Sequence, residues 1–346
     1  MPHLLAICFL IITLLACFIK IVSSAEINVA SVKGIVETEI ERRIREGRIN
    51  PSGHKILKIV MMTRNEYPLI VSWIEYHGKV YGFDNLYIID ASDEAQAIAA
   101  VKSAEKLGVT VKYSNANLNE VHIEIYYIMK SLVPTCDLMI KVDTDEFIAH
   151  YNPVTLSLST DKSTIMNHLD SLEFDGRKYM VGYIALNTNV TKGCTADNPV
   201  NAFTDFALFP SPSYKVIVPA ATFKAMDLGG HVGAVVDPYN TAPHHSNITI
   251  FHYHNHCYQH YIVLTRQAVL RHNYIYLNQS VPTQIEILSR LSEGFPQVCR
   301  IASCHKVYCY LQHLLDPELS ELNYIRSMER PGARLVSSTL IKDLLA

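Results

Sequence analysis

Apolar residues in the first half of the chain occur alternately in short continuous runs and in longer stretches with helical spacing. The continuous runs are typical of strands buried on both faces, and the spaced residues are typical of amphipathic helices. The pattern predicts strands at 55–62, 85–90, 109–113 and 138–142, and helices at 69–80, 94–107 and 119–132. Strands joined by crossover helices pair in parallel. The alternation therefore predicts an α/β domain with a Rossmann-like, mostly parallel sheet flanked by helices.

The second half of the chain has a less regular pattern. It predicts strands at 179–186 and 214–219, a polar loop at 187–204, and helices at 258–272 and 283–291. We therefore expect one domain over residues 55–315, with a mixed second half and a helical C-terminal part. Residues 316–346 are polar and are expected to form a peripheral tail.

The N-terminal segment 1–25 begins with an apolar run of about the length that crosses a bilayer as a helix. Small residues at Ser23 and Ala25 also fit a cleaved signal peptide. Either interpretation, a signal anchor or a signal peptide, predicts that the rest of the chain enters the secretory pathway. Residues 26–54 are charged and polar, include a predicted surface helix at 37–48, and are interpreted as a stem.

Cysteines and glycosylation sequons agree with a secretory location. The six cysteines outside the apolar run are Cys136, Cys194, Cys257, Cys299, Cys304 and Cys309. An even number permits disulfides in an oxidising compartment, but the pairing stays open. Cys304 and Cys309 could instead bind zinc, although a second ligand pair is missing. Sequons begin at Asn189, Asn247 and Asn278. The net charge of −3 gives no indication of a nucleic-acid surface.

Acidic residues follow the predicted strand 138–142 directly. Asp143 and Asp145 would share a face in an extended chain, and Glu146 is adjacent. Carboxylates packed this closely need a cation or strong hydrogen-bond donors, and Mg²⁺ or Mn²⁺ holding a diphosphate would meet that need. The alternative is a solvated acidic turn. The ligand interpretation gains weight because three predicted strands end in polar residues, which parallel pairing brings to one edge of the sheet.

Several spaced motifs together resemble glycosyltransferase family 92 and its family 2-like relatives. They are Met62-Thr63-Arg64-Asn65-Glu66, Trp73-Ile74-Glu75-Tyr76-His77, Gly82-Phe83-Asp84, Tyr87-Ile88-Ile89-Asp90 and Asp143-Thr144-Asp145-Glu146-Phe147. The resemblance covers residues 55–150, and continues more loosely to Tyr253. It implies a GT-A fold, a nucleotide-sugar donor, a divalent metal and a luminal catalytic domain.

The resemblance also implies roles for individual residues. The nucleotide pocket would be lined by Thr63, Arg64, Asn65 and Glu66, with Asp90 near the base or ribose. Asp143 and Asp145 would hold the metal and, through it, the diphosphate. A third ligand is expected to be a histidine, which favours Mn²⁺ over Mg²⁺. His231 is the first choice because glycines beside it allow close approach to a phosphate, and His252 is the second. Structural or surface roles are expected for His244, His245, His254, His256 and His260.

The acceptor side is less well defined. After His252 and Tyr253 the family pattern has a basic residue and a serine, whereas this chain has His254-Asn255-His256-Cys257. Lys215 could pair with a phosphate or simply be solvated. Asp197 and Asp205 are both candidates for the general base that inversion requires, and the sequence does not decide between them.

We therefore expect an inverting, metal-dependent glycosyltransferase that moves a hexose from a UDP-sugar to a glycan or glycoprotein acceptor. Galactose is the hexose that the resemblance favours. The alternatives are a metal-dependent hydrolase or phosphotransferase, and a non-catalytic carbohydrate-binding protein with the same fold. A Golgi membrane protein with a luminal domain is expected, or a secreted protein if segment 1–25 is cleaved.

Overall fold

The protein is described by a computed structural model. It describes residues 39–49, 53–116, 118–187, 200, 205–210, 215–253, 261–262, 265–266, 269–270, 276, 278–293, 310–312, 314–318 and 334–337. The predicted anchor or signal peptide, Asp197 and every cysteine except Cys136 lie outside these residues. Among the residues that are described, no helix is both long enough and apolar enough to span a membrane.

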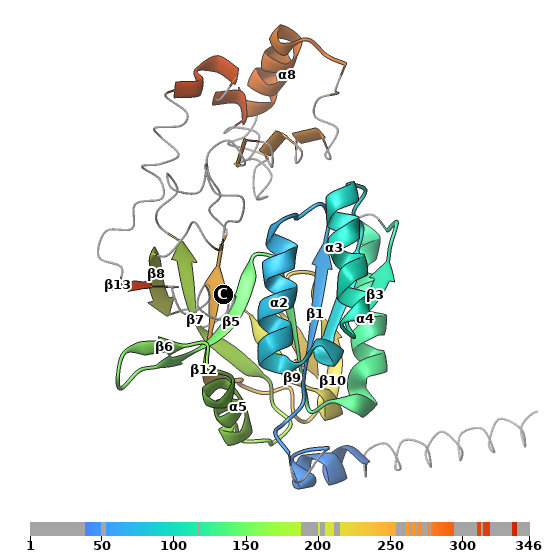
Figure 1. Cartoon of the computed structure of the whole chain (residues 1–346), viewed down its shortest axis with the longest axis vertical. Coiled ribbons are helices and arrows are strands. Elements are labelled where there is room, and N and C mark those ends of the chain that lie inside the picture. Colours follow the sequence, from blue (N-terminus) through green and yellow to red (C-terminus); the bar gives the residue numbers. More distant parts are fainter. Residues whose placement is uncertain are drawn as a thin grey trace, which may run out of the picture.

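The first half forms the predicted parallel sheet. Its strands are β1 (Leu57–Thr63), β2 (Leu86–Asp90), β3 (Thr110–Tyr113) and β4 (Leu138–Asp143), in the order β3-β2-β1-β4. All three pairings in this part are parallel. The connecting helices are α2 (Leu69–Tyr81), α3 (Ala95–Lys106) and α4 (Leu118–Leu132). Figure 1 shows them gathered around this half of the sheet. The predicted α/β fold is confirmed, with element ends within about two residues of the predicted ones.

Alternate residues of the central strand β1 face opposite layers of the core. Ile59 and Met61 belong to the core shared with α2 and α3, whereas Val60 belongs to the core shared with α4. This is the alternation expected of a strand covered on both faces, and it explains why β1 is apolar almost throughout.

The second half extends the sheet with mixed pairing. The strands are β5 (Glu146–Asn152), β6 (Ser157–Ser159), β7 (Tyr179–Asn187), β8 (Asp205–Pro210), β9 (Val216–Pro219), β12 (His244–His252) and β13 (Arg334–Ser337), and the helices are α5 (Lys162–Ser171) and α8 (Val281–Glu293). The order continues from β4 as β9-β7-β12-β5-β6. A separate antiparallel pair consists of β10 (Phe223–Met226) and β11 (Gly233–Val235). Short 3-10 helices occur at Phe83–Asn85, Val133–Thr135 and Ala220–Thr222.

The histidine-rich stretch forms β12, which the sequence pattern did not predict as a strand. This strand lies between β7, with which it is parallel, and β5, with which it is antiparallel. It therefore brings His252 beside Glu146, the first residue of β5. The sequon at Asn247 lies within β12, where Thr249 is fully buried, whereas Asn278 is exposed.

Residues 39–49, predicted to belong to a stem, contact the domain directly. Residues 39–46 are helical, and the Arg43 guanidinium donates to the carbonyl oxygens of Val133 (2.8 Å) and Cys136 (2.7 Å). Asp137 accepts from the Ile49 amide (2.6 Å) with one carboxylate oxygen and from the Ile56 amide (2.8 Å) with the other. This part of the predicted stem therefore contacts the segment that precedes β4, and the interpretation of residues 26–54 as a stem stays a prediction.

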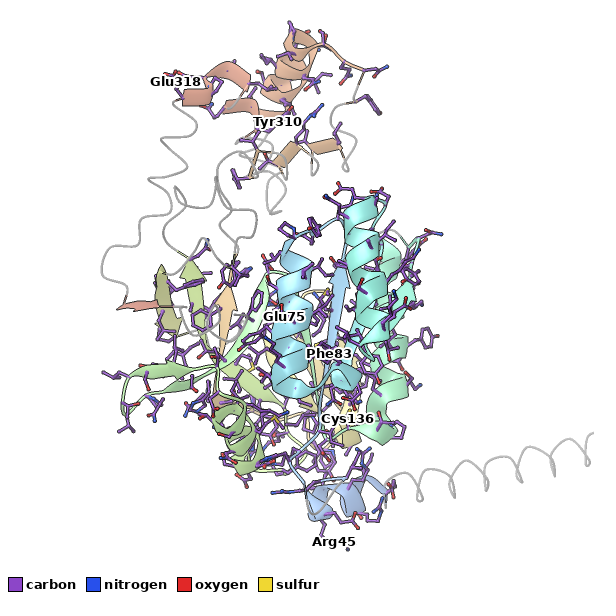
Figure 2. All side chains as sticks on the ribbon, viewed as in Figure 1. Arg45, Glu75, Phe83, Cys136, Tyr310 and Glu318 are labelled. Carbon is purple, nitrogen blue, oxygen red and sulfur yellow. The ribbon has the colours of Figure 1, made fainter. Side chains whose placement is uncertain are left out.

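Cys136 lies at the same end of the molecule as Arg45 (Figure 2). It is buried and forms no disulfide with another described residue. Burial raises the pKa of its thiol to about 12, so this cysteine is a packing residue rather than a nucleophile. The predicted pairing of the remaining cysteines stays a prediction.

Candidate functional site

The carboxyl ends of β1, β2 and β4 lie next to one another. Thr63 pairs with Asp90 across β1 and β2, and Met62 pairs with Asp143 across β1 and β4. The polar residues after these strands therefore meet at one edge of the sheet, as the sequence predicts. Open α/β sheets bind ligands at this edge.

Two buried polar atoms at this edge have no hydrogen-bond partner among the described residues. They are the Thr63 hydroxyl oxygen and Asp90 Oδ2. Thr63 is 6% exposed and Asp90 only 2%. The other Asp90 oxygen accepts from the Ser92 amide at 3.0 Å. Buried polar groups are nearly always paired, so this arrangement is suited to a bound molecule that carries a donor and an acceptor.

Asn65 connects the two loops that border these atoms. Its side-chain oxygen accepts from the amides of Asp93 (3.0 Å) and Glu94 (3.1 Å), and its side-chain nitrogen donates to the Asp93 carboxylate at 2.6 Å. Asn65 has a φ of 59°, a conformation that asparagine tolerates better than most residues. Its amide therefore holds the start of α3 against the end of β1, and the predicted contact of Asn65 with a nucleotide stays a prediction.

Arg64 and Glu66, the other two residues of this loop that were predicted to line the nucleotide pocket, lie next to Asn65. The exposed Arg64 guanidinium reaches the Asp93 carboxylate at 3.2 Å. Glu66 is partly exposed, and its backbone carbonyl accepts from the Ile70 amide at 2.9 Å in the first turn of α2. Their predicted contact with a nucleotide stays a prediction.

Asp143 lies between two buried lysines. Lys141 contacts one carboxylate oxygen and Lys215 contacts the other at 2.9 Å. Lys215 also contacts Glu146 at 2.8 Å and the carbonyl oxygen of Gly229. Burial alone would raise the pKa of Asp143, but Lys141 and Lys215 hold it below its ordinary value. The alternative of a solvated Lys215 is wrong, because its side chain is fully buried.

Asp145 pairs with a different partner. The chain turns at Thr144 and Asp145 instead of remaining extended, so Asp143 and Asp145 do not continue one strand face as predicted. The Asp145 carboxylate lies 3.1 Å from His252 Nε2, and its backbone carbonyl accepts from the Tyr253 amide at 2.8 Å. Burial alone would lower the pKa of His252, but the Asp145 carboxylate raises it above its ordinary value.

The spacing of Asp145 and His252 fits a shared cation. Adjacent ligands of an octahedral ion at about 2.1 Å are about 3 Å apart, close to the 3.1 Å between these two atoms. Asp143 fits a cation less well because both of its oxygens already contact ammonium groups. The second-choice ligand, His252, is therefore the histidine that the fold brings to the acids.

His231, the first-choice ligand, is exposed in the turn between β10 and β11. The glycines before it have a packing role that differs from the predicted one. A Cβ atom on Gly230, whose φ is 70°, would lie 2.5 Å from the Lys141 carbonyl oxygen, and the Gly230 carbonyl accepts from the Val216 amide at 3.0 Å. Gly230 lets the turn approach β4 closely, whereas a role for His231 in metal binding stays a prediction.

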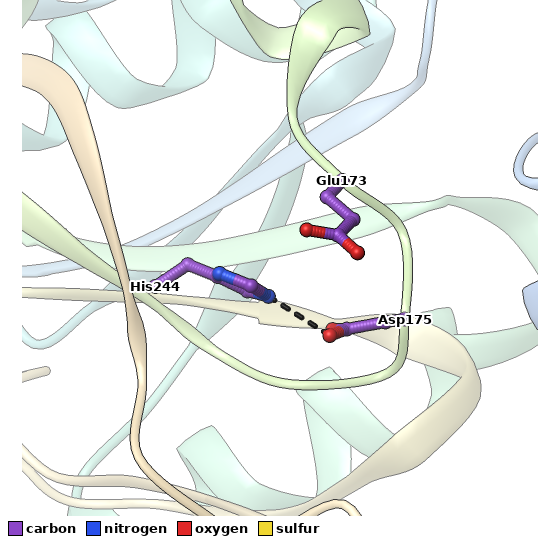
Figure 3. Close-up of side chains that lie close together, drawn as sticks. All are labelled: Glu173, Asp175 and His244. Atoms are coloured by element: carbon purple, nitrogen blue, oxygen red, sulfur yellow. Dashed lines mark hydrogen bonds and ion pairs between the residues drawn. The ribbon is translucent and has the colours of Figure 1, made fainter.

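A cluster of potential metal ligands lies elsewhere in the described part of the chain. Glu173, Asp175 and His244 have donor atoms within 4.8 Å of one another (Figure 3). His244 begins β12, at the opposite end of that strand from His252. Asp175 is already paired with His244 at 2.9 Å and with Arg177 at 2.6 Å. The structural or surface role predicted for His244 stays a prediction.

The fold does not decide between the two candidates for a general base. Asp197 lies outside the described residues. Asp205 is the first residue of β8, paired with Ser337 of β13, and its side chain is outside the described part. Both assignments stay predictions.

No protein-family model matches the chain, and no curated protein matches it in sequence. The solved structures that it resembles are distant. The mannosyltransferase PcManGT from Pyrobaculum calidifontis, in complex with GDP-Man and Mn²⁺, is 12% identical with a TM-score of 0.32, over 92% of this chain and 94% of that one. TarS 1-349 of S. aureus is 10% identical with a TM-score of 0.30, over 79% and 90%.

A cytidylyltransferase from Leptospira borgpetersenii is 12% identical with a TM-score of 0.26, over 49% of this chain. The chain spans 62% of the length of that protein, which is less than two thirds. Likeness at these levels says nothing about the activity of this chain. Membership of glycosyltransferase family 92 stays a prediction.

Proposed function

We propose that this protein is a glycosyltransferase that takes a hexose from a UDP-sugar and transfers it to a glycan or glycoprotein acceptor. The observation that carries this proposal is the pair of unpartnered buried atoms, Thr63 Oγ1 and Asp90 Oδ2, at the sheet edge that also holds Asp143 and Asp145. A nucleotide-sugar needs both a polar pocket for its nucleoside and counter-charge for its diphosphate.

Asp90 and Thr63 would bind the nucleoside. The unpartnered Asp90 oxygen can accept from a ring N–H of uracil or from a ribose hydroxyl, and the Thr63 hydroxyl can donate to a neighbouring oxygen. Both atoms belong to residues of paired strands, so the sheet fixes the backbone that carries them. Asn65 supports it by holding the adjoining loops together.

Asp145 and His252 would hold a divalent cation, Mn²⁺ or Mg²⁺. Mixed oxygen and nitrogen ligands favour Mn²⁺. When bound, such an ion supplies positive charge that stabilises the diphosphate leaving group. The resemblance implies Asp143 and His231 as ligands too, but both Asp143 oxygens already face ammonium groups and His231 is exposed in the turn after β10.

The finer assignments are part of the same proposal. Galactose as the sugar, inversion at the anomeric carbon, and Asp197 or Asp205 as the general base follow from the resemblance. So do a Golgi location and a membrane attachment through segment 1–25. Lys215 would act on phosphate only through its field, because its ammonium contacts Asp143, Glu146 and Gly229.

The proposal is tested by the binding of UDP to the full chain, followed by UDP release from a panel of UDP-hexoses with a glycan acceptor. Asp90→Asn keeps the shape of the side chain but replaces a carboxylate oxygen, so we expect UDP to bind at least about tenfold more weakly. Asp84→Asn is the matched control, since Asp84 is exposed just before the other end of β2. Equal UDP affinity of the wild type and the Asp90 variant would contradict the proposed pocket.

Asp145→Ala tests the cation site. We expect transfer to fall by about 100-fold or more, because an electrostatic group at the leaving diphosphate acts mainly on the transition state. The fold should be retained, since Asp145 lies in a turn at the end of β4. Turnover is measured as UDP release at saturating Mn²⁺, beside circular dichroism of the variant. Unchanged turnover in a folded variant would remove Asp145 from the site.

A further inference from the structure

The acidic residues after β4 lie against the ammonium groups of two buried lysines. Three carboxylates, Asp143, Asp145 and Glu146, lie within four residues of one another, and the ammonium groups of Lys141 and Lys215 offset two of their charges. Both lysine side chains are buried, with 1% and 0% of their surface exposed. A lysine is rarely buried so completely without charged partners.

The hydrogen bonds of Lys215 are saturated. An ammonium group has three hydrogens, and Lys215 meets three acceptors on Asp143, Glu146 and the Gly229 carbonyl. Lys141 comes from β4 itself, two residues before Asp143, and contacts the other Asp143 oxygen. Each oxygen of Asp143 therefore already faces an ammonium group.

The Gly229 and Gly230 turn holds this arrangement in place. Gly230 lies against the backbone of Lys141, where a Cβ atom would be only 2.5 Å from the carbonyl oxygen. The neighbouring Gly229 supplies one acceptor to Lys215. The two lysines are thus fixed by β4, β9 and the turn after β10, and not by a flexible surface loop.

We propose that Lys141 and Lys215 keep Asp143 from ligating a divalent cation, so that Asp145 and His252 are the ligands that the described part of the chain supplies. This rests on the proposed function, because it concerns the cation of the same nucleotide-sugar site. An ion beside Asp143 would lie close to two ammonium groups that are buried away from water, and like charges repel. Two protein ligands leave most positions of a six-coordinate ion to water or phosphate oxygens. The ion consequently binds firmly only together with the diphosphate.

The test measures Mn²⁺ binding to the full chain by the electron paramagnetic resonance signal of free Mn²⁺, without and with UDP. In the wild type, UDP should tighten Mn²⁺ binding at least about tenfold. Lys141→Met removes one ammonium group and frees an Asp143 oxygen, so Mn²⁺ alone should bind at least about tenfold more tightly than to the wild type. Lys141→Arg keeps the charge and should remain as weak as the wild type. Circular dichroism and thermal unfolding check the fold of each variant.

In Lys141→Met one Asp143 oxygen loses its ammonium partner, which could destabilise the fold. A second variant avoids this problem because it also removes the Asp143 carboxylate. Lys141→Met combined with Asp143→Asn removes one charge of each sign. Mn²⁺ affinity in the presence of UDP should stay within about threefold of the wild type, whereas Asp145→Ala and His252→Ala should each lose it by at least about tenfold.

The outcomes separate this inference from the proposed function. A tenfold loss of Mn²⁺ affinity in the double variant would show that Asp143 is a ligand, and no gain in Lys141→Met would show that Lys141 does not keep Asp143 from the ion. Either result would overturn the inference while UDP binding still supports the transferase. If UDP binds to no variant, with or without Mn²⁺, the proposed function fails. The Mn²⁺ affinities measured without nucleotide then still decide the role of Lys141.

Discussion

At the level of single residues, Asn65 shows how one side chain can hold two loops together at the edge of a sheet. Its amide makes three hydrogen bonds to Asp93 and Glu94, which end the loop after β2 and directly precede α3. The residue therefore couples the end of β1 to the start of α3. The unpartnered atoms of Thr63 and Asp90 lie at the ends of the same two strands.

Replacing Asn65 separates the hydrogen bonds from the backbone conformation. Asn65→Gly keeps access to the positive φ and removes the amide, so we expect a loss of about 2–3 kcal/mol in the free energy of unfolding. Asn65→Ala should lose about 1 kcal/mol more, because alanine is strained at this φ. Urea unfolding measures both values. Equal stability of the glycine variant and the wild type would show that the three hydrogen bonds contribute nothing net.

His77 is a buried histidine that stays neutral. Its Nδ1 hydrogen donates to the Trp73 carbonyl at 2.9 Å, and burial lowers the pKa of the imidazole to about 3. The unfolded chain binds a proton at this residue below about pH 6.5, whereas the folded chain does not. Stability must therefore fall as the pH falls below 6.5.

The His77→Phe variant tests this source of acid lability. Between pH 6.5 and 5, the wild type should lose about 2 kcal/mol more free energy of unfolding than the variant, at about 1.4 kcal/mol per pH unit. Urea unfolding at pH 5, 6 and 7 gives the two slopes. Other buried histidines, such as His168, titrate in both proteins and cancel in the comparison. Parallel slopes would mean that folded His77 takes up the proton.

At the level of elements, the turn between β10 and β11 depends on a glycine. Gly230 and Gly47 both have a φ of 70°, but only Gly230 has a neighbour where a Cβ atom would lie, whereas Gly47 has nothing within 4 Å. The two positions thus separate the conformational cost of alanine from the cost of a steric clash. The two positions also differ in their neighbours, because the turn that holds Gly230 contacts Lys215 through the Gly229 carbonyl.

Gly230→Ala should lower the free energy of unfolding by about 3 kcal/mol or more, the sum of backbone strain and overpacking. Gly47→Ala should lower it by about 1–2 kcal/mol, from backbone strain alone. Thermal and urea unfolding measure the difference, and Mn²⁺ binding should change only in the Gly230 variant. Equal losses in the two variants would show that the turn moves away from β4 without cost.

At the level of the whole molecule, the helix at 39–46 is fastened to the domain through one of two neighbouring arginines. Arg43 donates to two backbone carbonyls near the start of β4, at Val133 and Cys136. Arg42 instead pairs with Glu39 and Glu46 on the exposed side of the same helix. Replacing each arginine in turn therefore compares a contact that holds the helix to the domain with an ion pair on the surface.

Arg43→Ala should therefore lower the free energy of unfolding by about 2–3 kcal/mol, because a charged donor is removed from two partly buried carbonyls. Arg42→Ala should leave stability unchanged within error, since exposed ion pairs contribute little. Urea unfolding of the full chain measures both. If the two variants are equally stable, the helix is not held by Arg43, and residues 39–49 then behave as the predicted stem.

The amino-acid sequence by itself determined the parallel half of the sheet and the place of the acids at its edge. These features depend on local patterns, because apolar periodicity sets strands and helices, and crossover connections set parallel pairing. The predicted position of the acids at the carboxyl end of β4 follows from the same reasoning. Predicted and observed ends of β1 to β4 agree for this reason.

Only the tertiary structure decided which side chains meet. Lys215 reaches Asp143 across 72 residues of sequence, and His252 reaches Asp145 across 107. Such pairs depend on the order of β9 and β12 in the sheet, which local periodicity does not encode. The glycines beside His231 favoured that histidine in the sequence, and the two buried lysines were recognisable only once their carboxylate partners were in place.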